Sequence, residues 1–210
     1  GRDVSNSRNV MMRIGLETSL AEDVVDMLIE GDVTESPDTF QWIPFVDTKE
    51  IELSEGDGTK SITVKLRDSA GNVSEPASTA IVLDRSVPSS ASININDGAD
   101  YTESHQVTLS LSAKSAREMY ISGDIVRNDN TFRWVPFQMN YEARLTEGEG
   151  EKTVYAVFRN GVDNESDEVK AQIILDFSPP AIVSIRAFDV SDETDDDLNF
   201  HSGQQILIQA

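Results

Sequence analysis

The chain has 210 residues, of which 38% are hydrophobic, and this is enough apolar material for the cores of one or two domains. It contains no cysteine, which excludes disulfides, cysteine-ligated metal sites and thiol catalysis. Its net charge of −21, with basic residues scattered along the chain, argues against nucleic acid and anionic membranes as partners, because phosphate binding needs clusters of Lys and Arg. No segment has the ~18 consecutive apolar residues that a membrane-spanning helix needs.

Short segments in which apolar and polar residues alternate follow one another along the chain, separated by turn residues. Near the start, Met12, Ile14 and Leu16 alternate with polar or small residues. The second half has the clearest series, which predicts strands at residues 92–95, 106–112, 118–121, 131–135, 143–145, 153–159 and 170–175. Seven short strands at this spacing predict an all-β fold, an antiparallel β-sandwich.

The sequence repeats itself at an offset of 92 residues. Trp42 recurs as Trp134 and Asp84 as Asp176, and 21 of the 58 positions from 31 to 88 are identical to their counterparts without a gap. Such agreement indicates duplicated domains arranged in tandem. The earlier segment fits less well: Met12, Ile14 and Leu16 match Val107, Leu109 and Leu111 only at an offset of 95, with three extra residues in a loop at 18–26 that forms a helical turn or a bulge.

The repeat divides the chain into three predicted parts. We expect one domain at 1–88, whose first strand is missing or truncated, and a second at 89–181. A third begins at 182–210, because Ile182–Ile185 resembles Ala91–Ile93 and residues 200–208 resemble 101–109. Since this third part would end inside a strand, with an unpaired apolar edge, we expect the chain to be a window from a longer array.

Several motifs of the repeat resemble a known class of domains. Gly56-Asp57-Gly58-Thr59-Lys60, then Asp68-Ser69-Ala70-Gly71-Asn72-Val73-Ser74, then the segment from Ile81 to Pro88 are similar to the immunoglobulin-like repeats of large bacterial surface and secreted proteins. The second unit departs from this pattern, with Glu149 in place of Asp57 and Asn160-Gly161-Val162-Asp163-Asn164 in place of Asp68 to Asn72. The resemblance implies tandem immunoglobulin-like or fibronectin-III-like sandwiches in an extracellular protein.

Two features of the repeat have both a structural and a functional interpretation. The turn from Asp68 to Asn72 joins two strands, and we expect Asp68 to cap its own backbone, although a calcium site is the alternative. We expect Trp42 and Trp134 to pack in the cores with the neighbouring phenylalanines, and the alternative is an exposed platform for sugar stacking.

The acidic residues near the domain boundaries are the candidate metal ligands. An Asp that ends a last strand and the acidic loop of the next unit would converge where two sandwiches meet, and hard carboxylate oxygens there suit Ca²⁺. The candidates are Asp84, Asp97, Asp100, Asp176, Asp189 and Asp192. A solvated acidic loop is the alternative.

These observations favour a non-enzymatic function. No Ser/His/Asp set can be assembled in each unit, since the first unit contains no histidine. We therefore expect a structural array at the surface of a bacterial or archaeal cell, in a surface layer, filament or adhesin stalk, with neighbouring repeats, other copies or cell-surface components as partners. The alternative is a carbohydrate-binding or accessory module of a larger secreted enzyme.

Overall fold

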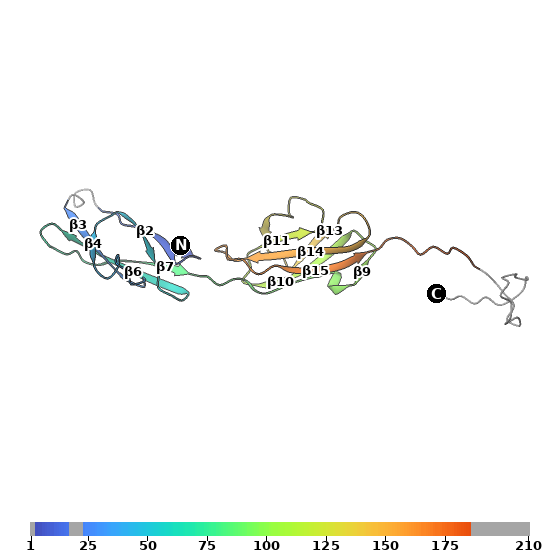
Figure 1. The fold of residues 1–210 in the computed structure, drawn as a ribbon, viewed down its shortest axis with the longest axis horizontal. Helices are drawn as coiled ribbons and strands as arrows, with labels where there is room; N and C mark the ends of the chain where they lie inside the picture. The colour runs from blue at the N-terminus through green and yellow to red at the C-terminus, as the bar shows by residue number, and fades with distance from the viewer. Residues whose placement is uncertain (1–2, 17–22, 186–210) are drawn as a thin grey trace, which may run out of the picture. The chain divides into compact units, whose positions relative to one another are not determined.

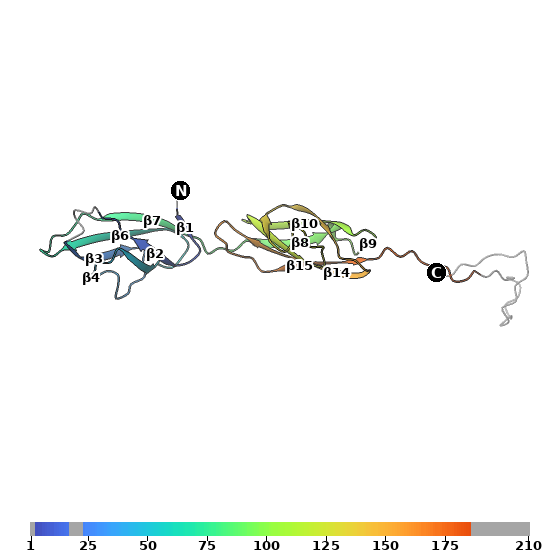
Figure 2. The same cartoon turned by 90° about the horizontal axis from the view of Figure 1, so that it is seen from above.

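The computed structural model describes residues 3–16 and 23–185, and nearly all of the regular structure in them is β-strand. The chain divides into two compact units, Gly1–Asp176 and Phe177–Ala210. The first unit contains two β-sandwiches (Figures 1 and 2), which confirms the predicted fold class.

The second sandwich is the more complete one. One of its sheets has the strand order β13-β10-β8, and the other has the order β12-β11-β14-β15-β9. All pairs are antiparallel except β15 with β9. Its strands are β8 (Ser89–Ile95), β9 (Tyr101–Thr102), β10 (Gln106–Lys114), β11 (Glu118–Gly123), β12 (Trp134–Pro136), β13 (Asn140–Arg144), β14 (Gly150–Arg159) and β15 (Val169–Leu175).

The first sandwich repeats this arrangement with one strand fewer among the described residues. Its larger sheet has the order β1-β7-β6-β3-β4, again with one parallel pair, between β1 and β7, and its smaller sheet contains only β2 and β5. Its strands are β1 (Asp3–Ser5), β2 (Asn9–Arg13), β3 (Val24–Gly31), β4 (Trp42–Pro44), β5 (Thr48–Glu52), β6 (Gly58–Asp68) and β7 (Ala77–Leu83).

The strand register corrects the predicted match between the two sequence repeats near the start of the chain. Met12 pairs with Lys49, and Leu109 pairs with Tyr141, which lies 92 residues after Lys49. Met12 is therefore the counterpart of Leu109 at an offset of 97, and the predicted offset of 95 was wrong. An error of two residues leaves each side chain on the same face of a strand, which is why the alternation did not reveal it. The predicted helical turn or bulge at 18–26 falls mostly on residues 17–22, outside the described residues.

The predicted strand at 131–135 is also partly wrong, because β12 begins only at Trp134. The preceding residues form a tight turn in which the backbone N–H of Asn128 donates to the Thr131 hydroxyl at 2.9 Å. Phe132 follows with φ of +56°, far from the extended values of a regular β-strand. Thr39 and Phe40 form the same turn in the first sandwich.

A repeated glycine ends β3 and β11 in a conformation that only glycine allows. Gly31 and Gly123 have φ of +109° and +102°, and a Cβ on either would lie 2.3 Å from a carbonyl oxygen of the neighbouring strand. The following aspartate closes the same bend, since Asp124 Oδ2 accepts a hydrogen bond from the N–H of Thr153 at 2.9 Å. The repeated Gly-Asp pair is therefore explained by backbone geometry.

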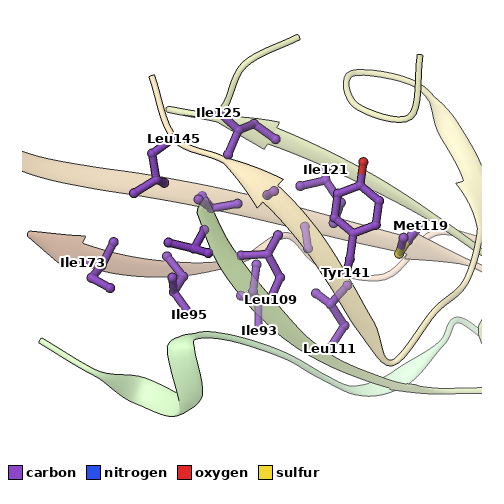
Figure 3. Packing of buried hydrophobic residues seen from close by; sticks show 14 of the residues in the cluster. Ile93, Ile95, Leu109, Leu111, Met119, Ile121, Ile125, Tyr141, Leu145 and Ile173 are labelled. Atoms are coloured by element: carbon purple, nitrogen blue, oxygen red, sulfur yellow. The ribbon is translucent and has the colours of Figure 1, made fainter. Parts of the chain in front are cut away.

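Each sandwich has its own hydrophobic core between its two sheets. Figure 3 shows the core of the second, where Ile93 and Ile95 of β8 lie beside Leu109 and Leu111 of β10. Phe158 on β14 is fully buried there. In the first sandwich its counterpart Leu66 is only half-buried.

Candidate functional site at the linker

The linker between the sandwiches, residues 84–88, is bound by side chains on both of its sides. On one side, the Asp57 carboxylate accepts hydrogen bonds from the backbone N–H of Arg85 and from its Nε, each at 3.1 Å. These bonds from Arg85 hold the pKa of Asp57 below its ordinary value. Asp57 lies in the Gly-Asp-Gly turn before β6, so this turn ties the linker to the first sandwich.

Two asparagines of the second sandwich bind the linker from the other side. The Asn164 side-chain amide donates to the carbonyl of Asp84 at 2.8 Å and to that of Ser86 at 3.0 Å. The Asn160 amide donates to the same Ser86 carbonyl at 2.9 Å. The turn from Asn160 to Asn164 thus satisfies linker carbonyls that have no strand partner.

The corresponding turn of the first sandwich is closed on itself. The Asp68 carboxylate accepts from the backbone N–H groups of Ala70 at 2.9 Å and Asn72 at 2.8 Å, and from the Asn72 side-chain amide at 2.8 Å. The bonds from Asn72 are the main cause of a lowered pKa at Asp68. The expected capping role of Asp68 is therefore present in the structure.

One substitution between the repeats accounts for the difference between the two turns. Asn160 stands where the first repeat has Asp68, and its Oδ1 accepts from the backbone N–H groups of Val162 and Asn164, both at 3.0 Å. An amide has this acceptor and also an N–H donor that a carboxylate lacks. Because Asn160 has no second carboxylate oxygen to hold Asn164, both side-chain amides point to the linker.

The two tryptophans do not pack in the cores as predicted. In β4 and β12, it is Ile43 and Val135 that face inward, so the neighbouring tryptophans lie half-buried on the outer face of the sheet. The alternation of a strand leaves only one of two adjacent residues in the core. Of the neighbouring phenylalanines, Phe45, Phe132 and Phe137 pack against the cores as predicted, whereas Phe40 is 46% exposed, contrary to the prediction.

Each tryptophan is covered by an arginine that is paired with an acid. The guanidinium of Arg67 lies 4.6 Å from the ring centre of Trp42, and that of Arg159 lies 4.5 Å from the ring centre of Trp134. Arg67 pairs with Asp26, and Arg159 pairs with Glu118 at 2.6 Å. This stack of ring, cation and carboxylate is stabilising at a half-buried surface and occupies the ring face that a sugar would need.

The structure separates some of the predicted metal ligands. Asp84 lies at the linker, where its carboxylate accepts from the backbone and hydroxyl of Ser86, whereas β8 separates it from Asp97 by about 20 Å of extended chain. Asp97 accepts a hydrogen bond from Ser110, and the Asp100 carbonyl accepts one from the N–H of Ile174, near Asp176. Within residues 3–16 and 23–185, no group of three or more potential ligands could hold a metal ion. Asp189 and Asp192 lie outside the described residues, and calcium binding stays a prediction.

The linker site was not predicted from the sequence. The signal was present as the change from Asp68 to Asn160 in an otherwise repeated turn. The sequence does not reveal the role of this change, because the partners of Asn160 and Asn164 lie 74 to 80 residues earlier in the chain.

In the described part of the chain, no helix has the length and apolar character needed to cross a membrane.

Comparisons with known proteins show similarity in fold only. No protein-family model matches the sequence, and no curated protein matches it. The fibronectin(III)-like modules of Clostridium thermocellum CbhA align with a TM-score of 0.46 and 12% identity, over 83% of this chain and 88% of theirs. The FN1–FN3 domains of chicken CNTN1 align with a TM-score of 0.40 and 11% identity, over 83% and 64% of the two chains.

The D00–D0 domain of intimin aligns with a TM-score of 0.32 and 13% identity, over 83% of this chain and 95% of its own. Because these TM-scores are below 0.5, the assignment of the fold rests on the strand order and pairing described above. Two sheets of this order, packed face to face in each repeat, have the immunoglobulin-like, fibronectin-III-like sandwich fold.

Proposed function

We propose that this chain is a structural part of a tandem sandwich array in an extracellular or cell-surface protein, where it acts by its length and by the stiffness of its linker. The observation that carries the proposal is the pair of side-chain amides, Asn160 and Asn164, that donate to the linker carbonyls of Asp84 and Ser86. A linker that is hydrogen-bonded loses conformations that a free linker would sample.

The contacts of Arg85 add to this argument. Its backbone and side chain are bound by Asp57, and its guanidinium also lies 3.6 Å from Glu55. Exposed ion pairs contribute little individually, so the weight of the argument lies in the combination with the two asparagines. Pro88, directly before β8, further restricts the backbone.

A surface layer, a filament and an adhesin stalk are all built from modules that are held at set distances along a chain, and this is the setting that we propose. The strongly acidic composition fits a solvated surface, and partners in this setting are neighbouring repeats, other copies or cell-surface components. The alternative of a carbohydrate-binding module has less support, because Arg67 and Arg159 cover the rings that would stack on a sugar.

Limited proteolysis tests whether the asparagines hold the linker. Trypsin cleaves after Arg85, in the middle of the bound segment, and cleavage requires this segment to leave its partners. Asn164→Ala removes the two hydrogen bonds that the Asn164 amide donates to the linker. We expect cleavage of the peptide bond after Arg85 to become roughly fivefold faster for a loss of about 1 kcal/mol. Mass spectrometry of the fragments over time gives the rate.

Asn72→Ala is the matched control, since Asn72 has the same place in the first repeat and donates to Asp68 instead of the linker. Cleavage after Arg85 is expected to keep its wild-type rate in this variant. Equal rates in wild-type protein, the Asn164 variant and the Asn72 variant would contradict a held linker, and with it the proposed function.

A further inference from the structure

Asn160 is followed by a glycine, and this pair of residues is chemically labile. Asn160-Gly161 is the only Asn-Gly pair in the sequence. Because glycine has no Cβ, its backbone nitrogen is unhindered and can attack the side-chain amide carbon of the residue before it. The corresponding pair in the first repeat is Asp68-Ser69, which has no side-chain amide to lose. The labile pair therefore lies in the turn that binds the linker.

The reaction open to this pair is the deamidation of Asn160. The Gly161 N–H gives its proton to water or hydroxide, and its nitrogen forms a bond to Cγ of Asn160. The bond from Cγ to Nδ2 then breaks, and ammonia leaves with a proton taken from solvent. Water opens the resulting succinimide ring at one of its two carbonyl carbons, which leaves aspartate or isoaspartate at position 160. Either product has a carboxylate where the turn had an N–H donor.

The bound linker holds the Asn160 side chain in a state that disfavours this reaction. The residue is 6% exposed, and its Oδ1 accepts from the backbone N–H groups of Val162 and Asn164, both at 3.0 Å. Its Nδ2 donates to the Ser86 carbonyl at 2.9 Å. A side chain fixed by three hydrogen bonds has little freedom to approach the attacking nitrogen, and ammonia leaves only after Nδ2 has lost its acceptor. The rate therefore depends on how often the linker leaves the turn.

The first repeat shows how the turn is arranged when the residue is an aspartate. In both repeats Oδ1 accepts a backbone N–H bond from the residue four positions later, Asn72 in the first and Asn164 in the second. The other side-chain atom differs. Oδ2 of Asp68 accepts from the Asn72 side-chain amide at 2.8 Å, whereas Nδ2 of Asn160 donates to the linker. An aspartate at position 160 has the same atoms as Asp68 and the same asparagine amide within its turn.

We propose that Asn160 is a deamidation site and that its conversion releases the linker. A carboxylate oxygen in the place of Nδ2 faces the Ser86 carbonyl oxygen, and two acceptors without a hydrogen between them repel each other. A buried carboxylate needs a donor, and the Asn164 amide supplies one as the Asn72 amide does for Asp68. All three side-chain hydrogen bonds to the linker are then lost. This inference rests on the proposed function, and it gives the stiffness of the linker a limited lifetime.

Mass spectrometry of the ageing protein tests the site. The folded chain is incubated in weakly alkaline buffer beside a sample unfolded in urea, and trypsin then releases residues 160–170 as one peptide. Fragmentation of this peptide distinguishes Asn160 from Asn164. We expect Asn160 to convert more slowly in the folded than in the unfolded chain, but faster than Asn72, whose following valine hinders the attack. Conversion no faster than that of Asn72, or a rate equal to that of the unfolded chain, would overturn the proposal.

Asn160→Asp tests the consequence of the reaction, since it reproduces one product with a residue that the first repeat already has at this place. We expect trypsin cleavage after Arg85 to become roughly 10- to 100-fold faster, because three hydrogen bonds of about 1 kcal/mol each are lost. Asp68→Asn, the reverse change in the other repeat, is the control and is expected to keep the wild-type rate.

The same assay separates this inference from the proposed function. If Asn164→Ala speeds cleavage after Arg85 and Asn160→Asp does not, the linker is held but deamidation does not release it, and this inference alone fails. If neither variant speeds cleavage, the linker is not held by the turn, and the proposed function fails with it.

Discussion

The two sandwiches share a strand order and a set of motifs, but within the described residues they differ in one strand and in the contacts of one turn. The second has β8, which closes its core over Phe158, and its Asn160–Asn164 turn binds the linker. Leu66 of the first is only half-buried, and its Asp68 carboxylate binds groups of its own turn, from Ala70 and Asn72, with no bond to the linker among the described contacts. Duplicated sequence therefore preserves the sheets, while the surfaces that meet other segments have diverged.

The largest expected effect tests the difference between the cores. Phe158→Ala removes a fully buried ring, and we expect it to destabilise the second sandwich by about 3–5 kcal/mol. Leu66→Ala at the matching position of the first core is expected to cost only about 1–2 kcal/mol, because its side chain is already half-exposed. Denaturant unfolding of the two variants measures both values. Equal losses would show that the first core is as closed as the second in solution.

A second prediction tests what the sandwiches have in common. Gly31→Ala and Gly123→Ala each place a Cβ 2.3 Å from a backbone oxygen at positive φ. We expect each change to cost about 2–4 kcal/mol in its own sandwich, since the clash is with backbone that cannot move away. Thermal unfolding followed by NMR, which reports on each sandwich separately, distinguishes the two. Gly56→Ala, at a turn with positive φ but open space around it, is the control and is expected to cost less.

The smallest expected effect concerns pH. The hydrogen bonds from Asn72 hold the pKa of Asp68 below its ordinary value, so the stabilisation of the first turn is present above that value and is lost as the pH falls through the pKa of the folded state. The second turn has Asn160 at this place, and an amide does not titrate. We expect the amide signals of Ala70 and Asn72 to shift under acid. Asp68→Asn is expected to remove the shift, and an unchanged titration of Ala70 and Asn72 in this variant would contradict the assignment.

Much of the fold could be predicted because it depends on local patterns that the sequence repeats. Alternation located most strands, and the 92-residue offset identified the duplication. The start of the first repeat was placed two residues out of register, because the pairing of β2 with β5 fixes the register and alternation does not. The outward position of Trp42 and Trp134 was missed since hydrophobicity alone does not tell which face of a short strand is buried.

The linker site could not be predicted because it depends on contacts between distant segments. Asn160 has an amide nitrogen where Asp68 has a second carboxylate oxygen. The effect of this change depends on the position of the Ser86 carbonyl, to which the Asn160 amide donates. The acidic residues suggested a metal site from their positions near the domain boundaries, but sequence gives no distance between Asp84 and Asp97. Side-chain partners far apart in the chain require the three-dimensional arrangement.

The most direct test of the held linker is its backbone mobility. Nitrogen-15 relaxation of Arg85, Ser86 and Val87 gives an order parameter for each residue on the picosecond to nanosecond timescale. If Asp57, Asn160 and Asn164 hold this segment, we expect its order parameters to be about 0.85, the value of a rigid backbone such as strand β14. Values below about 0.6 would show a flexible connection and would contradict the proposal that stiffness is the function of this part of the chain.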